Sequence, residues 1–76
     1  MIKYTCEMED AGYKYEHELV LGPNEAARKS AEQYCAEAAE YDDLPRVIVT
    51  TKAGGRWVFE IEVEFDPVFY ASEVQE

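Results

Sequence analysis

The chain has 76 residues, which is enough for one small domain and too few for two. It carries 17 Asp and Glu against 7 Lys and Arg, a formal net charge of −10. That charge disfavours direct binding to nucleic acid or to an anionic membrane and favours a basic partner. The hydrophobic fraction of 47% and the aromatic fraction of 13% are typical of a folded domain, not of a disordered chain.

No apolar run in the sequence is long enough for a signal peptide or a membrane span. We therefore expect a cytoplasmic protein. In that compartment Cys6 and Cys35 are expected to be reduced and unpaired.

Residues 2–9 and 13–21 both alternate between apolar and polar side chains, which predicts two half-buried strands of a hairpin. A two-residue loop at 11–12 would place Cys6 opposite His17 on the apolar face. This register also keeps the remaining apolar side chains of the two strands on one face.

An alanine-rich segment at residues 24–41 predicts a helix. Either Asn24 caps its N-terminus, or Gly22 does so with Pro23 in the first helical position. Small side chains in the apolar stripe would let the helix lie close to the sheet. This stripe consists of Ala27, Ala31, Tyr34, Cys35 and Ala38.

Residues 46–52 and 57–65 predict a second hairpin with a three-residue loop at 53–55. A glycine in that loop would take the left-handed conformation. With this loop Val49 would lie opposite Phe59 on the apolar face.

The C-terminal residues leave two alternatives open. Asp66 and Pro67 end the fourth strand, and residues 68–70 either begin a short C-terminal helix or extend the sheet. The predicted fold is α+β in the order ββαββ. In it, one helix packs on one face of a four-stranded, mostly antiparallel sheet within a single acidic domain at 1–76. The strand order stays open, and the other face of the sheet is exposed to water or to a partner.

The stretch WVFEIEVEF at residues 57–65 places Glu60, Glu62 and Glu64 on one side of the fourth strand. Because the single helix covers only the apolar face, these carboxylates should lie on the open face. Same-face residues recur every ~6.7 Å along a strand, so the carboxylates repel one another. Neutral Thr or Gln would suit an exposed strand better, so the fold alone does not demand these charges.

A second group of acids falls at the C-terminal end of the helix, where the helix dipole favours Lys or Arg. Charges that oppose local stability without local gain indicate a functional surface. We therefore predict a partner-binding surface of Glu16, Glu18, Glu37, Glu40, Asp42, Asp43, Glu60, Glu62 and Glu64. The alternative is a hydrated face without a role, in which outward cations such as Lys3 and Arg46 pair with the acids.

Cys6, His17 and Cys35 are expected to approach one another in the core, but they lack the ligand number and spacing of a structural zinc site. A buried Cys–His pair in so small a domain leaves no room for a substrate. We therefore expect no metal, no cofactor and no catalytic residue, and the protein is not expected to be an enzyme. Aromatic residues that are harder to bury are candidate interface anchors: Tyr41, Phe69 and Tyr70.

In size, acidity and layout the whole chain resembles the small phage-encoded inhibitors of bacterial defence, the anti-CRISPR and anti-restriction proteins. Several of these carry acidic faces that imitate the nucleic-acid backbone. The resemblance implies a non-enzymatic inhibitor in the host cytoplasm that binds a basic nucleic-acid-binding protein or complex, without direct contact to nucleic acid.

The opening stretch MIKYTCEMEDAGYKYEHELVL, followed by a helix, is also similar to the HicB type of antitoxin. The chain departs from that pattern because the glycine-rich loop expected before the helix is missing. The alternative function is therefore a protein-interaction module, such as an antitoxin or an accessory subunit. Such a module would dock through aromatic residues or a sheet edge.

Overall fold

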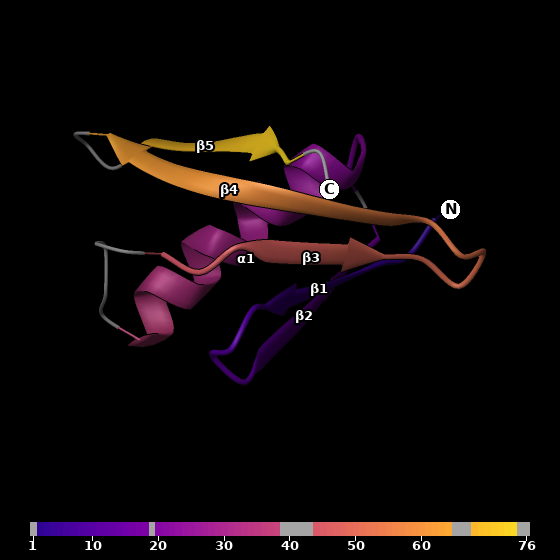
Figure 1. Ribbon diagram of the computed structural model, residues 1–76, viewed down its shortest axis with the longest axis horizontal. Helices are drawn as coiled ribbons and strands as arrows, with labels where there is room; N and C mark the ends of the chain where they lie inside the picture. The colour runs from indigo at the N-terminus through magenta and orange to yellow at the C-terminus, as the bar shows by residue number, and fades with distance from the viewer. Residues whose placement is uncertain (1, 19, 39–43, 65–67, 75–76) are drawn as a thin grey trace.

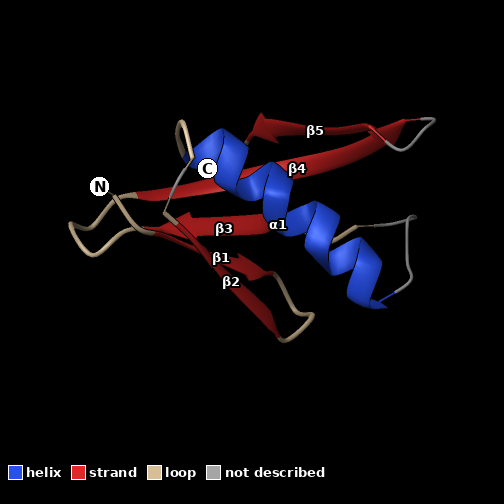
Figure 2. Cartoon of the chain, turned by 180° about the vertical axis from the view of Figure 1, so that it is seen from behind, coloured by secondary structure: helices blue, strands red, loops and turns tan. Residues whose placement is uncertain are grey.

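In the computed structural model, one helix packs on one face of a five-stranded antiparallel sheet (Figures 1 and 2). The structure describes residues 2–18, 20–38, 44–64 and 68–74. The elements are β1 (Tyr4–Met8), β2 (Tyr13–His17), α1 (Pro23–Ala38), β3 (Val47–Thr50), β4 (Arg56–Glu64) and β5 (Val68–Glu73). The strand order is β2-β1-β3-β4-β5. The α+β class is confirmed, and the ββαββ order is followed by one further strand.

The fifth strand settles the alternative that the sequence left open at residues 68–70. β5 pairs with β4 from Val68 opposite Glu64 to Glu73 opposite Phe59. Phe69 is buried against the core, whereas the residues on either side of it are exposed, so the strand alternates with a period of two. The four-stranded sheet and the short C-terminal helix were therefore wrong, while Asp66 and Pro67 lie outside the described residues.

The first hairpin pairs two residues away from the predicted register. Cys6 lies opposite Tyr15 instead of His17, because the connection runs over residues 9–12. Within it Asp10 and Gly12 both take the left-handed conformation, with φ of 59° and 77°.

The second hairpin shows the same displacement. Val47 lies opposite Phe59 and Val49 lies opposite Trp57. The loop has three residues as predicted, but it consists of residues 52–54, with Gly54 at φ 97°. A shift of two residues leaves every side chain on its own face, so the predicted faces are confirmed although the cross-strand partners were wrong.

β2 ends at His17, and the expectation that this strand continues to residue 21 is wrong. α1 begins beside the opposite edge of the sheet, where the Asn24 side-chain amide donates to the Ala71 carbonyl at 2.8 Å. β2 and β5 are four strand spacings apart, about 19 Å. The segment from the end of β2 to the start of α1 therefore has to leave the sheet and cross it. Leu21 lies in this crossing and is 97% exposed.

The first helical residue is Pro23, so Gly22 occupies the N-cap position, and the Ala26 N–H donates to its carbonyl at 3.1 Å. The buried stripe of α1 includes Ala26 and Ser30, which lie outside the predicted stripe, whereas the predicted Ala38 is only partly buried. The core lies between this stripe and the largest buried side chains of the sheet, which are Met8, Val47, Val49 and Phe59. In the described ranges, no helix is both long and apolar enough to cross a membrane.

Candidate partner-binding surface

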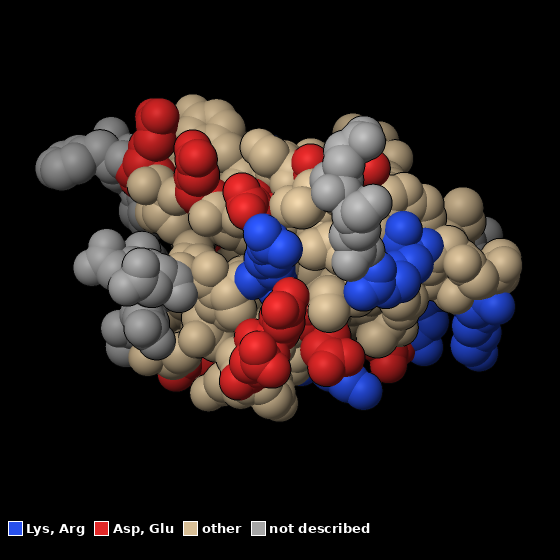
Figure 3. Space-filling model, in the orientation of Figure 1, with Lys and Arg blue, Asp and Glu red and all other residues tan. Residues whose placement is uncertain are grey.

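The sheet face opposite α1 carries Glu60, Glu62 and Glu64 in a row along β4. All three are exposed, and they alternate with Ile61 and Val63, which pack against the core. Figure 3 shows this face, with acidic side chains in a diagonal row at upper left and a basic side chain next to the row. The row therefore lies on the face that the alternation in WVFEIEVEF predicts.

One member of the row is neutralised within the molecule. Arg46, one residue before β3, places its Nη2 atom 3.0 Å from Glu60 Oε1. Both side chains are about half exposed, and an exposed ion pair of this kind contributes less than about 1 kcal/mol. In the described part of the chain no ion pair is formed by Glu62 or Glu64.

Glu16 and Glu18 lie far from this row. Glu16 is on β2, and β1 and β3 separate that strand from β4. Its carboxylate accepts a hydrogen bond from Lys3, which lowers the pKa of Glu16 and raises the pKa of Lys3. Glu18 is exposed just after β2 and adds a smaller charge effect that also raises the pKa of Lys3. Glu16 and Glu18 therefore interact with Lys3 of the same molecule, at the opposite edge of the sheet from β4 and β5.

Glu37 lies on α1, on the helix side of the sheet. Its Oε2 atom accepts a hydrogen bond of 2.7 Å from the Tyr15 hydroxyl, and burial together with this carboxylate raises the pKa of Tyr15. The contact ties the helix to β2, which gives Glu37 a structural role. Glu40, Asp42 and Asp43, the other predicted acids at the helix end, lie outside the described residues, as does Tyr41.

The structure therefore does not bring the described members of the predicted surface into one patch. What remains together is Glu62 and Glu64 on β4, with their cross-strand partners Tyr70 and Val68 on β5. Tyr70 is 48% exposed and Val68 is 44% exposed, on the same open face. We call these four residues the β4–β5 patch. The sequence did not predict this grouping, because both a helix and a strand are compatible with residues 68–70. The alternation in VFYASE favours the strand.

A second polar cluster is buried between the sheet and α1. His17 Nε2 lies 2.9 Å from Ser30 Oγ, and both Ser30 and the neighbouring Cys6 are fully buried. Burial, followed by the charge of Lys29, lowers the pKa of His17, and burial raises the pKa of Cys6. His17 is partly buried and Cys6 is fully buried, and each has a hydrogen bond with the Ser30 side chain. A buried thiol whose pKa is raised is not an activated nucleophile.

The two cysteines and His17 do not form a metal site. Cys6 and Cys35 are both buried, and no disulfide joins them. Among the described residues no group of three His, Cys, Asp or Glu side chains is arranged to hold a metal ion. The expected position of His17 opposite Cys6 was wrong, since Tyr4 is its cross-strand partner.

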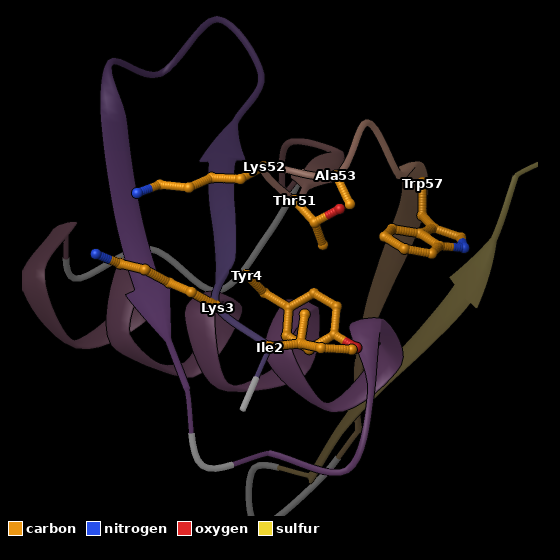
Figure 4. Close-up of a pocket in the computed structure, with 7 residues that line it drawn as sticks. All are labelled: Ile2, Lys3, Tyr4, Thr51, Lys52, Ala53 and Trp57. Carbon is orange, nitrogen blue, oxygen red and sulfur yellow. The ribbon is translucent and has the colours of Figure 1, made fainter.

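One hollow of about 360 Å³ lies at the end of the sheet near the N-terminus (Figure 4). Ile2, Tyr4 and Trp57 form much of its wall, and the Tyr4 and Trp57 rings meet edge to face with centroids 6.1 Å apart. Lys3 and Lys52 contribute their stems, while their ammonium groups point away from the aromatic rings. The hollow is therefore suited to packing an apolar group.

A second hollow, of about 420 Å³, lies at the N-terminus of α1, between the crossing segment and Phe59 of β4.

Comparison with known proteins finds no family model, no curated protein and no solved structure that matches the chain. The chemistry of the β4–β5 patch is therefore the basis for a functional proposal.

Proposed function

We propose that this protein is a non-enzymatic inhibitor of the anti-CRISPR or anti-restriction type, which binds a basic nucleic-acid-binding protein or complex in the host cytoplasm. The observation that supports it is the β4–β5 patch, where Glu62 and Glu64 are exposed and form no ion pair within the described residues. Carboxylates in this position compete with nucleic-acid phosphates for the Arg and Lys side chains of the partner.

The energetics of the strand support recognition over hydration alone. Glu60, Glu62 and Glu64 repeat at ~6.7 Å along one strand, which weakens the sheet slightly. Arg46 relieves the repulsion at Glu60 only. The net charge of −10 adds a long-range field that accelerates association with a basic partner and is screened by salt.

Fewer carboxylates support this proposal than the nine that the sequence predicts. Lys3 and Arg46 already contact Glu16 and Glu60. Because these pairs are solvent-exposed, they hold the carboxylates only weakly. A guanidinium of the partner can therefore replace Arg46 at Glu60 at little cost, so this residue stays at the margin of the proposed surface.

A second candidate function is a protein-interaction module, such as an antitoxin or an accessory subunit. Tyr70 favours it, because a half-exposed tyrosine on an edge strand is a common interface anchor. Such a module would bind through apolar contacts and backbone hydrogen bonds and would be nearly indifferent to salt.

Capture of partners from host lysate at low and high salt distinguishes the two functions. The double reversal Glu62→Lys/Glu64→Lys should abolish capture, and raised salt should weaken capture by the wild type. The matched control is Glu9→Lys/Glu32→Lys, which changes net charge equally at exposed positions away from the patch. Unchanged capture by the Glu62/Glu64 variant would reject the inhibitor proposal. Loss of capture with Tyr70→Ala at both salt concentrations, together with capture retained by Glu62→Lys/Glu64→Lys, would support the interaction module.

A further inference from the structure

The outer edge of β5 presents backbone groups that form no backbone hydrogen bond within the described residues. The Val74 N–H donates to the Val58 carbonyl at 2.7 Å, so Val74 bonds to β4. Along an antiparallel pair, residues that bond to the neighbouring strand alternate with residues whose backbone groups point away from it. The N–H and C=O groups of Phe69 and Ala71 therefore point away from β4. The hydrogen bond from the Asn24 amide to the Ala71 carbonyl independently shows that this carbonyl faces outward.

The other edge of the sheet is protected by charge. The Glu9 N–H donates to the Arg46 carbonyl, so odd-numbered residues of β1 bond to β3 and even-numbered residues bond to β2. The outward-bonding residues of β2 are therefore Lys14 and Glu16, which are charged and exposed. Charged side chains on an edge strand oppose pairing with another chain. Of the outward-bonding residues of β5, Phe69 and Ala71 carry no charge, and only Glu73, at the end of the strand, does. The two edges of the sheet (Figure 1) therefore differ over Phe69 and Ala71, where β5 has no counterpart of Lys14 and Glu16.

We propose that β5 is the docking edge of the protein and that the partner adds an extended segment to it, with Arg or Lys at alternate positions. This inference rests on the proposed function, because Glu62 and Glu64 determine the charge of the segment. Docking uses three outward backbone groups, which are the N–H and C=O of Phe69 and the N–H of Ala71. The segment ends where Asn24 already occupies the Ala71 carbonyl.

The spacing of the strands brings the basic side chains of such a segment over the β4–β5 patch. A strand added to β5 lies about 4.8 Å from it and about 9.6 Å from β4. A Lys or Arg on the open face extends over Val68 or Tyr70 toward the carboxylates of Glu64 and Glu62. The Tyr70 ring, which is half exposed, offers its face to the passing cation.

The test uses two capped octapeptides as probes, one of alternating Arg and Val and one of alternating Glu and Val. Binding is followed by amide NMR shifts and by hydrogen exchange at Phe69 and Ala71. We expect the Arg peptide to slow exchange at both amides by about tenfold or more, and the Glu peptide to leave it unchanged. We also expect Glu62→Lys/Glu64→Lys to remove the effect of the Arg peptide.

Ala71→Pro removes the outward N–H without removing a bond to β4, and proline is tolerated at such edge positions. It should lower the affinity for the Arg peptide by about tenfold. The matched control Ala71→Ser, which keeps the N–H, should bind the Arg peptide as the wild type does. If Ala71→Pro does not fold, the exchange measurement on the wild type still decides the question.

The outcomes separate the inference from the function on which it rests. Shifts confined to residues 60–64, without slowed exchange at Phe69 and Ala71, would overturn edge docking and leave the acidic surface in place. If the Arg peptide still slows exchange in Glu62→Lys/Glu64→Lys, then β5 is a docking edge, but the segment it binds need not be basic. That result would overturn both the basic segment and the inhibitor proposal. Absence of binding by both peptides would overturn the docking edge as proposed.

Discussion

Arg46 Nη2 lies 3.0 Å from Glu60 Oε1, and this ion pair divides the acidic row of β4 into a compensated end and an uncompensated end. On the far side of the pair are Glu62 and Glu64, which are exposed and form no ion pair among the described residues. Arg46 therefore sets how much of the row is available to a basic partner.

Arg46→Ala should extend the available row to Glu60. Because the pair is exposed, the free energy of unfolding in urea should fall by less than about 1 kcal/mol. Capture of basic partners at low salt should increase, because a third carboxylate becomes free and net charge becomes more negative. Lys52→Ala, which removes one exposed charge from the β3–β4 loop, is the control for net charge. Equal capture by the two variants would mean that Glu60 has no special part in binding.

Gly55→Ala should destabilise the hairpin that carries Trp57. A Cβ atom at this position would lie 2.6 Å from Trp57 Cη2 and 3.0 Å from Thr51 Oγ1, so the indole has to move. Overpacking of this kind costs typically about 1–3 kcal/mol, measured by urea unfolding, and it should change the tryptophan fluorescence of the folded state.

The double variant Gly55→Ala/Trp57→Leu tests the cause of that loss. If the clash with the indole is responsible, the double variant should be more stable than the sum of the two single changes predicts. Additive losses would show instead that the backbone at Gly55 is the source of the destabilisation.

The faces of the sheet were predictable, because strand alternation depends only on neighbouring residues. Glu60, Glu62 and Glu64 lie outward, while Ile61 and Val63 pack inward, as a period of two requires. The hairpin registers were wrong by two residues, because the first connection takes four residues, 9–12, instead of two, and the second loop lies one residue earlier than predicted. Such an error preserves the faces and changes only the cross-strand partners.

The composition of the surface could not be predicted, since it depends on strand order. Glu16 and Glu60 both lie on exposed strand positions, but two strands separate them, and each has its own cation. Ser30 also escaped prediction, because a serine in a helix is ordinarily exposed and only its contact with His17 explains its burial. These errors all concern tertiary partners, which a single sequence does not show.

His17 should make stability depend on pH above the range in which the carboxylates titrate. Its pKa is lowered in the folded protein by burial and then by Lys29, from an ordinary value of 6.5. The unfolded chain therefore binds a proton first as the pH falls, so the free energy of unfolding should decrease as the pH drops below about 6.5. The slope should not exceed about 1.4 kcal/mol per pH unit, the limit for one proton.

Urea unfolding between pH 7.5 and about 5 measures this slope, in a range above the ordinary pKa of Glu. Glu16 has its pKa lowered from 4.5 by Lys3, so its own contribution is lost only at lower pH. In His17→Gln the slope should disappear, although the variant retains a side chain able to bond Ser30 Oγ. A slope that persists in this variant would assign the pH dependence to another group.

Asn24→Ala should expose the remaining acceptor on the edge of β5. The variant loses the hydrogen bond from the Asn24 amide to the Ala71 carbonyl, which should cost about 0.5–1.5 kcal/mol in urea unfolding. An edge strand without this cover presents a longer run of unpaired groups, so self-association should rise with protein concentration in sedimentation velocity. Gln33→Ala, an exposed polar change on the same helix, is the control and should sediment as the wild type does. If Asn24→Ala also sediments as the wild type does, even at high concentration, then the amide does not guard the edge, and the free groups of Phe69 and Ala71 are protected by other means.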